Sequence, residues 1–541
     1  MLPAWPVSGV AATSAVSAKE AAGLTVAGKN RRKAEVSTKK TTGGADSIVD
    51  VIPAVRGFRR TSELEDSILF NNLPQSLSLE TGQLDTVGGR PVVEIAVPDS
   101  LRKFSDVSFV EQITLPQAIR EAFDFSRDVK TAQSRMDQAA SQSRQARGTL
   151  LPSLSVRNAR GDETSSPASF LDPVTGNAKT RDRHLRKDET ITFRQPLFDA
   201  PSFLDWQRRD LLVDSREGSL RGSEGDTYVV TVQSYLTLAS TLLLTELYKE
   251  YEQQLTLLFD YVAQRAAAGA SSEADMERVR ARNLTARSAR LEQEAAYSAA
   301  VIDFVRLTNI APRTLRLPRR QDASGIVPDN FDQGVELALE TNPEVKTLKA
   351  ELEAAEKDIQ AARARFLPRL DFELSDSKVT NAGGALGLQH DQRAMLVMNW
   401  NVLNGTTDYY NIREKQERRT EFMWRLDDQQ RRLKQSLAAQ YATLDATRAR
   451  LAAGYREWSS IYSAARSMSQ RMLAGNQSLL DLLDVLDRVQ QARARLISLH
   501  AQEILALAQI SRLIGKLPDG STLEAISVMP EPIAPSPRSG T

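Results

Sequence analysis

The chain has 541 residues, with 70 lysines and arginines against 69 aspartates and glutamates, so its formal net charge is only +1. This balance gives no reason to expect a nucleic-acid partner. Cysteine is absent, which excludes disulfides, thiolate zinc sites, iron–sulfur clusters and a cysteine nucleophile. The three histidines, His184, His390 and His500, are far apart in the sequence, and no helical histidine pair occurs. We therefore expect no catalytic residues, no metal site and no cofactor, and an enzyme is the least favoured class of function.

Residues 1–110 are expected to form an amino-terminal extension that is largely disordered. Small residues dominate its first half, together with a basic cluster, and no apolar period is sustained there. A secretory signal needs a basic start and an apolar core, and neither precedes Ala18. The start is misplaced, the signal is missing, or the protein is not exported, and the sequence leaves these three explanations open. Within the extension, residues 92–97 predict one short strand.

The placement of proline predicts very long helices. Residues 202–311 and 369–517 contain no proline and are rich in good helix formers. A helix of about 65 residues would be about 100 Å long, deeper than an ordinary globular core, so we expect coiled-coil packing. Residues 227–245 carry no charge, but eight of them are Thr, Ser or Gln. A helix with a broad packed face is therefore favoured there over a membrane-spanning helix.

An internal twofold repeat organises the rest of the chain. Residues 113–122 and 329–338 are each predicted to begin a helix of about 35 residues, ending at Leu151-Pro152 and Leu367-Pro368. The repeat divides the chain into parts with the same predicted order of helix, strand pair and long helical hairpin. The predicted parts are a first repeat over 111–325, a second repeat over 326–517 and a proline-rich tail over 518–541.

Four segments alternate apolar and polar residues with the period of two that strands show. A half-buried soluble sheet explains one such segment, whereas four together favour a membrane barrel with one face toward lipid and the other toward a polar lumen. Residues 157–188 and 376–390 are then expected to be loops joining the strand pairs. The predicted lipid-facing residues are Phe193, Phe372, Met398 and Trp400.

Four strands are too few to close a barrel, which takes about eight even when side chains fill the interior. Open sheet edges in lipid would leave backbone amides unpaired, so the strands must pair with those of other copies. The membrane interpretation therefore requires an oligomer.

Residues 110–517 resemble the TolC-type outer-membrane channels of envelope efflux and type I secretion systems. The resemblance rests on the twofold repeat, the Leu-Pro helix ends, the sequence Pro-Leu-Phe-Asp at 196–199, and a helical turn at Gly475 followed by Asp481 and Asp484. It implies an α+β membrane protein in which a long α-helical coiled-coil barrel continues a transmembrane β-barrel with four strands per protomer. It also implies a homotrimer in the outer membrane with its helices in the periplasm.

The resemblance further implies a passive exit duct, opened at its periplasmic helical end. Its partners would be a periplasmic adaptor (membrane fusion) protein, an inner-membrane pump or ABC transporter, and outer-membrane lipid. The implied adaptor-contact turns are Gly269 with Ala270 and Gly475 with Asn476. The implied gate at the pore entrance comprises Asp481, Asp484 and Asp275, with Asp487 predicted on the same helical face.

A soluble coiled-coil scaffold or interaction protein is the alternative from another class. In it, the four alternating segments would form small sheets and the long helices would bind partners. Fractionation distinguishes the two, because only a channel should stay with outer membrane through salt or carbonate washes. The sequence does not indicate which substrate is transported.

Overall fold

The computed structural model describes residues 92–95, 107–165, 174, 182–318, 327–384, 387–473 and 478–517. Most of the predicted extension and the whole proline-rich tail lie outside the described residues, as do Gly475 and Asn476. The short strand predicted within the extension is present as β1 (Val92–Glu94).

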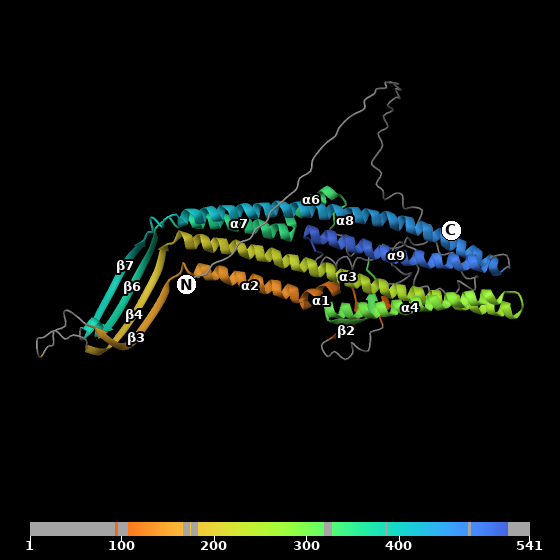
Figure 1. Cartoon of the computed structure of the whole chain (residues 1–541), viewed down its shortest axis with the longest axis horizontal. Helices are drawn as coiled ribbons and strands as arrows, with labels where there is room; N and C mark the ends of the chain where they lie inside the picture. Colours follow the sequence, from red (N-terminus) through yellow and green to blue (C-terminus); the bar gives the residue numbers. More distant parts are fainter. Residues whose placement is uncertain are drawn as a thin grey trace, which may run out of the picture. The chain divides into compact units, whose positions relative to one another are not determined.

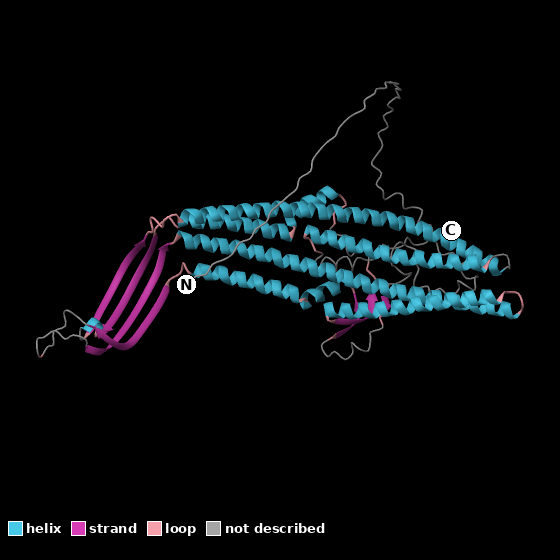
Figure 2. Cartoon of the chain, viewed as in Figure 1, coloured by secondary structure: helices cyan, strands magenta, loops and turns pink. Residues whose placement is uncertain are grey.

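Long helices dominate the described part of the chain, with strands at two places (Figures 1 and 2). The helices are α1 (Leu115–Phe125), α2 (Arg127–Gly148), α3 (Ala200–Ala267), α4 (Glu273–Thr308), α6 (Phe331–Thr341), α7 (Pro343–Ala364), α8 (Thr407–Leu473) and α9 (Leu479–Ile514). The other strands are β2 (Ser108–Ile113), β3 (Ser153–Ser165), β4 (Asp182–Phe198), β5 (Ile310–Arg316), β6 (Arg369–Thr380) and β7 (Leu388–Asn399), with the short helix η5 (Ala382–Gly384) between β6 and β7.

The two longest helices have the predicted length. Helix α3 has 68 residues and α8 has 67, and each is followed by a helix of 36 residues, α4 or α9. Both 36-residue helices end at a residue in the left-handed conformation, Asn309 and Gly515, which satisfies the last carbonyl groups of a helix. The two halves of the chain thus contain hairpins of matching length and matching ends.

The helices predicted over residues 113–150 and 329–366 are each interrupted once, and in this the prediction was wrong. The interruptions lie at Ser126 and Asn342, whose side chains accept a hydrogen bond from the backbone N–H three residues later. Ser and Asn compete for backbone groups in this way and so favour a new helix start. Each predicted helix of about 35 residues is therefore an 11-residue helix followed by a 22-residue one.

The strands form two separate sheets. A three-stranded sheet has the order β1-β5-β2, with β5 antiparallel to β1 and parallel to β2. A four-stranded antiparallel sheet has the order β3-β4-β6-β7. Its strands run well into residues 157–188 and 376–390, which were predicted as loops. The prediction failed there because these strand ends are mostly polar and show no apolar period.

Each strand of the four-stranded sheet continues into one of the long helices (Figure 1). Helix α2 leads into β3, β4 into α3, α7 into β6, and β7 toward α8. Among these helices, α2 packs on α3, α3 on α7, and α7 on α8. The helices therefore follow the same lateral order as the strands.

The largest apolar core lies where the hairpins meet the three-stranded sheet. Tyr235 of α3 is fully buried, packs edge-on against Phe304 of α4, and its hydroxyl hydrogen-bonds the carbonyl of Arg316. Tyr441, at the matching place on α8, donates to the carbonyl of Pro328 at 2.8 Å. Of the described helices, only α3 is long and apolar enough to cross a membrane by composition. Its uncharged stretch contributes many residues to this core, as the packed-face interpretation expects.

Candidate functional site

The four-stranded sheet has two chemically different faces. Residues directly opposite one another in an antiparallel pair share a face, so the register assigns each side chain to one side. Phe193 lies opposite Leu154 and Leu374, and Phe372 lies opposite Leu396. All of these side chains therefore belong to one surface, which we call the apolar face. In the half of the sheet near the helices it comprises Leu154, Val156, Ile191, Phe193, Leu370, Phe372, Leu374, Ala394, Leu396 and Met398, while Leu185 and Leu388 lie on the same side farther out among polar residues.

The apolar face is uncovered in the single chain. Leu154 is 69% exposed, Leu396 63% and Met398 62%. Large apolar side chains that are exposed side by side mark a surface that contacts lipid or a partner protein. Of the four predicted lipid-facing residues, Phe193, Phe372 and Met398 lie on this face.

The opposite face is mostly polar. Arg194 forms an ion pair with Asp371 at 2.5 Å, and this carboxylate is almost completely buried although it lies in a strand. Thr190 and Ser377 are within hydrogen-bonding distance across the β4–β6 pair, at 3.3 Å. Arg369, at the start of β6, pairs with Asp199, which caps the N-terminus of α3. A polar interior with paired charges is the expected lining of a water-filled lumen.

Aromatic and apolar side chains gather where the sheet joins the helices. Trp400 follows β7, is 54% exposed, and its ring N–H donates to the carbonyl of Phe366 at 3.0 Å. It therefore lies at the end of the apolar face, beyond the strand, and not at its centre. Tyr409 and Tyr410 begin α8 with both rings exposed and in edge-to-face contact. Amphipathic rings at such a boundary are typical of the girdles that flank a membrane band. In the sequence, the adjacent tyrosines at 409 and 410 are the signal that indicates this girdle.

The edge strands of this sheet, β3 and β7, each have one side without a partner strand within the described chain. They are long, with 13 and 12 residues. Long, unprotected edges are avoided in soluble proteins because they pair with other chains. Strand β3 leads away from the helices and β7 returns toward them, so β7 of one copy would pair antiparallel with β3 of the next.

The far end of hairpin α3–α4 turns at Gly269 and Ala270, as predicted from the sequence. Gly269 has a φ of +73°, and the N–H of Ala270 donates to the carbonyl of Arg265 at 2.8 Å. These features satisfy the last carbonyls of α3 and require a residue that tolerates positive φ. Both turn residues are exposed. The matching pair, Gly475 and Asn476, lies outside the described residues.

The predicted gate residues lie in the first turns after the two hairpin ends. Asp481 and Asp484 are exposed on α9, and Asp484 forms an ion pair with Arg488 at 3.3 Å. Asp275 forms an ion pair with Arg278 of its own helix at 2.8 Å. Leu480, next to Asp481, is 59% exposed, and the sequence analysis did not single it out.

Asp487 is not part of this exposed group, contrary to the prediction. Its carboxylate accepts a hydrogen bond from the Tyr251 hydroxyl of α3 and forms an ion pair with Arg282 of α4 at 2.6 Å. The reason is geometric: a step of three residues turns a helix by about 60° short of a full circle, so two such steps turn the side chain by about 120°. Asp487 therefore joins the two hairpins.

A second polar contact between the hairpins is more deeply buried. Glu250 of α3 pairs with Arg493 of α9 at 3.0 Å, and the two side chains are only 5% and 11% exposed. Burial raises the pKa of the Glu250 carboxyl above its ordinary value, and the nearby positive charge of Arg493 opposes the shift. Among the described residues, one oxygen of Glu250 has no hydrogen-bond partner, and Arg493 is the cation that this carboxylate contacts there.

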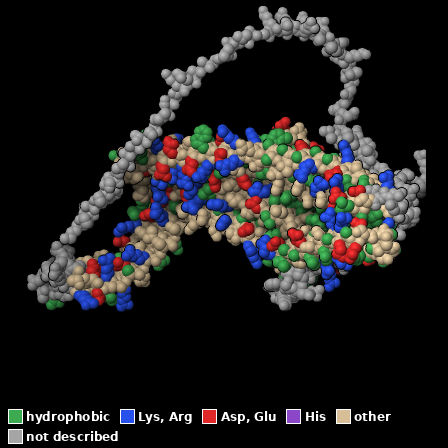
Figure 3. Space-filling model, turned by 45° about the vertical axis from the view of Figure 1, so that its right-hand side comes forward, with side chains coloured by type: hydrophobic (Ala, Val, Ile, Leu, Met, Phe, Trp, Pro, Cys, Tyr) green, Lys and Arg blue, Asp and Glu red, His purple; other side chains and the backbone are tan. Residues whose placement is uncertain are grey.

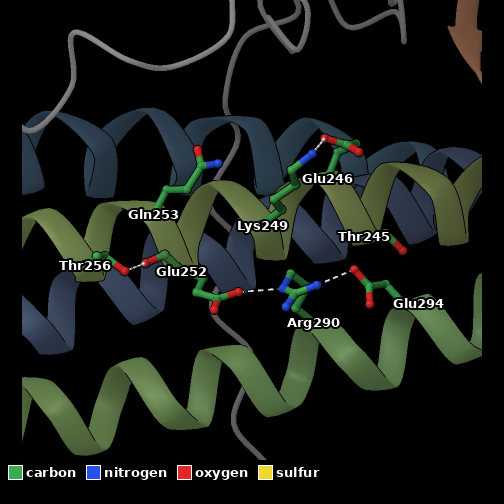
Figure 4. A pocket seen from close by; sticks show the side chains of 8 residues that line it. All are labelled: Thr245, Glu246, Lys249, Glu252, Gln253, Thr256, Arg290 and Glu294. Atoms are coloured by element: carbon green, nitrogen blue, oxygen red, sulfur yellow. Dashed lines mark hydrogen bonds and ion pairs between the residues drawn. The ribbon is translucent and has the colours of Figure 1, made fainter.

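A groove of about 340 Å³ runs along the outside of hairpin α3–α4 (Figure 4). Arg290 of α4 lies between Glu252 and Glu294 and pairs with both. Lys249 pairs with Glu246 at 3.7 Å. The charges of the groove are thus matched within the hairpin, and they do not form a set of groups aimed at a ligand. Its remaining lining residues are Thr245, Gln253 and Thr256.

In the described part of the chain, no group of three or more histidine, aspartate or glutamate side chains could hold a metal ion. Charged side chains of both signs are interspersed over the helices (Figure 3). The surfaces that distinguish this molecule are therefore the two-faced sheet with its free edges and the exposed hairpin ends.

Comparisons with known proteins agree with this geometry. Residues 334–516 match the family described as outer membrane efflux protein. The proteases secretion protein PrtF of Dickeya chrysanthemi is 24% identical over 390 residues, which cover 69% of this chain and 81% of that protein. The solved structure of the outer-membrane channel OprN superposes with a TM-score of 0.62 at 16% identity, over 74% of this chain and 90% of that one. The structure of CusC, which is described in terms of transmembrane channel formation, superposes with a TM-score of 0.62 at 16% identity. The match covers 80% of this chain and 99% of that one.

The fold and its two-faced sheet define an outer-membrane channel. Residues 334–516 match the outer membrane efflux protein family, and the fold is similar to that of solved TolC-type outer-membrane channels; the chain functions as an exit duct in the outer membrane. This is a family of transport proteins and not of enzymes.

Proposed function

We propose that three copies of the chain form one duct, in which a twelve-stranded transmembrane β-barrel continues into a barrel of long helices. The observation that carries this proposal is the shared lateral order of strands β3-β4-β6-β7 and helices α2-α3-α7-α8. Such a sheet and helical layer form one sector of a tube with two open edges. Pairing β7 of one copy with β3 of the next closes the tube and leaves no strand edge in lipid.

The number three comes from the resemblance to TolC-type channels, and the strand count is compatible with it. Two copies give eight strands, and side chains fill the interior of a barrel of that size. Three is thus the smallest number of copies that leaves room for a passage. The hairpins of the two halves, α3–α4 and α8–α9, match in length. This match supports a twofold repeat in which each half contributes an equivalent part of the helical barrel.

The apolar face sets the level of the membrane. Ala394, Leu396 and Met398 of β7 lie on that face, and Trp400 and Val402 continue the apolar alternation in the sequence after the strand ends at Asn399. These nine positions, of which the last three follow the strand, match the thin hydrocarbon layer of an outer membrane, about 25 Å. A soluble scaffold would leave this surface in water, which makes it the weaker interpretation.

The hairpin ends are proposed as the periplasmic entrance. Gly269 with Ala270, and Gly475 with Asn476, would meet a periplasmic adaptor protein, and Leu480 adds an exposed apolar contact there. An inner-membrane pump or ABC transporter would supply the energy, and the duct itself would perform no chemistry. The name of PrtF favours secreted protein as the transported substrate, and the efflux family description favours small molecules as the second candidate.

Assembly provides the direct test of this proposal. We expect extraction in mild detergent to yield a particle of three protomers, because a single copy leaves two long strand edges unpaired. Light scattering coupled to size-exclusion chromatography measures the mass of the particle. A monodisperse monomer that keeps its strand content would overturn the proposal.

A ring of carboxylates at the entrance should make the duct prefer cations. We expect the double variant Asp481→Asn, Asp484→Asn to assemble normally but to lose this preference, with the cation-to-anion permeability ratio falling toward one. The expected ring would also bind divalent cations, so their block should weaken in the variant. In planar bilayers, reversal potentials measure the selectivity, and the fall of the single-channel current on addition of divalent cations measures the block.

The matched control for the entrance variant removes two aspartates elsewhere. Asp427→Asn with Asp428→Asn eliminates the same charge from exposed ion pairs in the sheet-proximal half of α8. This control should keep the selectivity of the parent. Asp487 is unsuitable as a control because its carboxylate links the hairpins. If the entrance variant and the parent have equal selectivity, these aspartates do not line the pore.

A further inference from the structure

Beyond the apolar band, on the same face of the sheet, two cations lie directly opposite each other. Arg160 on β3 pairs in register with Lys187 on β4. Both side chains are exposed. Like charges placed directly opposite on adjacent strands destabilise a sheet. The pair therefore has an unfavourable arrangement unless something negative binds there.

The neighbouring charges on this face are matched within the sheet. Glu189 lies opposite Lys378 in the β4–β6 register. His390 and Asp376 are in contact at 2.7 Å, and Arg183 pairs with Asp162 at 2.5 Å. For Arg160 and Lys187, the described part of the chain provides no carboxylate within ion-pair distance. The excess of positive charge on this face is thus confined to one row.

The position of the row fits the headgroup region of a membrane. Arg160 is four residues along β3 from Val156, the last residue that this strand contributes to the apolar face. At the rise of a strand, this separation is about 13 Å, and less along the membrane normal because the strands tilt. The row lies in the half of the sheet far from the helices, and charged side chains of both signs are visible at that end of the molecule (Figure 3). With the helices in the periplasm, that end faces the outer leaflet.

We propose that Arg160 and Lys187 bind the phosphate groups of outer-leaflet lipid headgroups. The inference rests on the proposed function, because it assigns the apolar face to lipid. A guanidinium offers two parallel N–H groups to a phosphate and an ammonium adds a compact charge. One phosphate between them would turn the repulsion of the row into attraction. Three copies would place three such sites around the barrel.

The test compares the full-length protein with two double variants, all purified in an uncharged detergent. Arg160→Gln with Lys187→Gln removes the proposed site. Arg157→Gln on β3 with Arg393→Gln on β7 removes the same amount of charge from the opposite face of the sheet. Native mass spectrometry counts bound lipid for two probes, diphosphorylated lipid A and lipid A stripped of its phosphates. In a third arm, inorganic phosphate is added alone, and its effect on the dissociation temperature of the oligomer is measured.

We expect the parent and the opposite-face variant to bind diphosphorylated lipid A, and the site variant to bind it about tenfold more weakly or worse. The stripped lipid should not distinguish the three proteins. Without lipid, the site variant should be at least as stable as the parent, because its repulsion is gone, so weaker binding cannot be ascribed to misfolding. Equal binding of both lipids by the parent overturns the inference.

Two further outcomes separate this inference from the proposed function. A stabilisation by inorganic phosphate as large as that by the phosphorylated lipid would overturn the assignment to lipid, because free phosphate would then suffice. If the parent fails to form a membrane-inserted oligomer at all, the proposed function fails first. An oligomer that inserts normally but ignores the phosphates overturns only the lipid site.

Discussion

Phe193→Arg is expected to abolish stable insertion into the outer membrane. Phe193 lies in the middle of the apolar face, between Leu154 and Leu374 in the register. A cationic side chain on the lipid face of a membrane barrel near mid-depth costs about 2–4 kcal/mol, and in the proposed trimer every copy bears that cost. Membrane fractions washed with carbonate should therefore lose the variant while they retain the parent.

Thr192→Arg is the matched control, because it places the same residue one position away on the polar face. This variant should remain in the membrane. Trp400→Asp should have a smaller effect than Phe193→Arg, since Trp400 lies beyond the strand at the boundary and charges near the interface cost little. Equal retention of Phe193→Arg and Thr192→Arg would mean that the faces are wrongly assigned.

Arg493→Met is expected to destabilise the packing of the two hairpins by about 3–5 kcal/mol, because it leaves the Glu250 carboxylate buried without a partner. Only Arg493 balances this carboxylate in the described contacts of its side chain. The dissociation and unfolding temperature of the purified oligomer, followed by circular dichroism, measures the loss. The double variant Glu250→Gln with Arg493→Met should recover most of it.

The deficit of Arg493→Met should depend on pH in a defined direction. Burial raises the pKa of Glu250 above its ordinary value, and removal of Arg493 takes away the charge that opposes this shift. A carboxyl with a raised folded-state pKa binds its proton more tightly in the folded protein, so its stability contribution is present at low pH and lost as pH rises through that pKa. The difference in stability between parent and variant should thus become smaller as the pH is lowered. A gap that widens on acidification would exclude Glu250 as the cause.

Much of the helical architecture is predictable because its signals are local. The proline-free stretches predict α3 and α8, and the repeated Leu-Pro pairs predict the helix ends before β3 and β6. The interruptions at Ser126 and Asn342 are not predictable from helix propensity, because a single capping side chain decides them. The polar strand ends were missed for the opposite reason: pairing with neighbouring strands holds them, and their composition gives no periodic signal.

In the candidate site, too, the residues set by local patterns were predictable and those set by distant partners were not. Alternation within each strand predicts Phe193, Phe372 and Met398 on one face, and the register then brings these distant segments together. Trp400 continues the alternation in the sequence but lies past the end of β7. For Asp487, equal spacing along the helix suggested a shared face, whereas its partners Tyr251 and Arg282 come from two other helices. Long-range partners of this kind are not encoded in local spacing.

The open edges of β3 and β7 have a genetic consequence. In the proposed trimer a neighbouring copy completes each edge, so a defective chain that still pairs will be built into ducts beside intact chains. In a cell that makes equal amounts of both, about one duct in eight would contain intact copies only. A variant such as Asp481→Asn with Asp484→Asn, which assembles but alters the entrance, should therefore be dominant over the parent. Phe193→Arg, which does not insert, should be recessive.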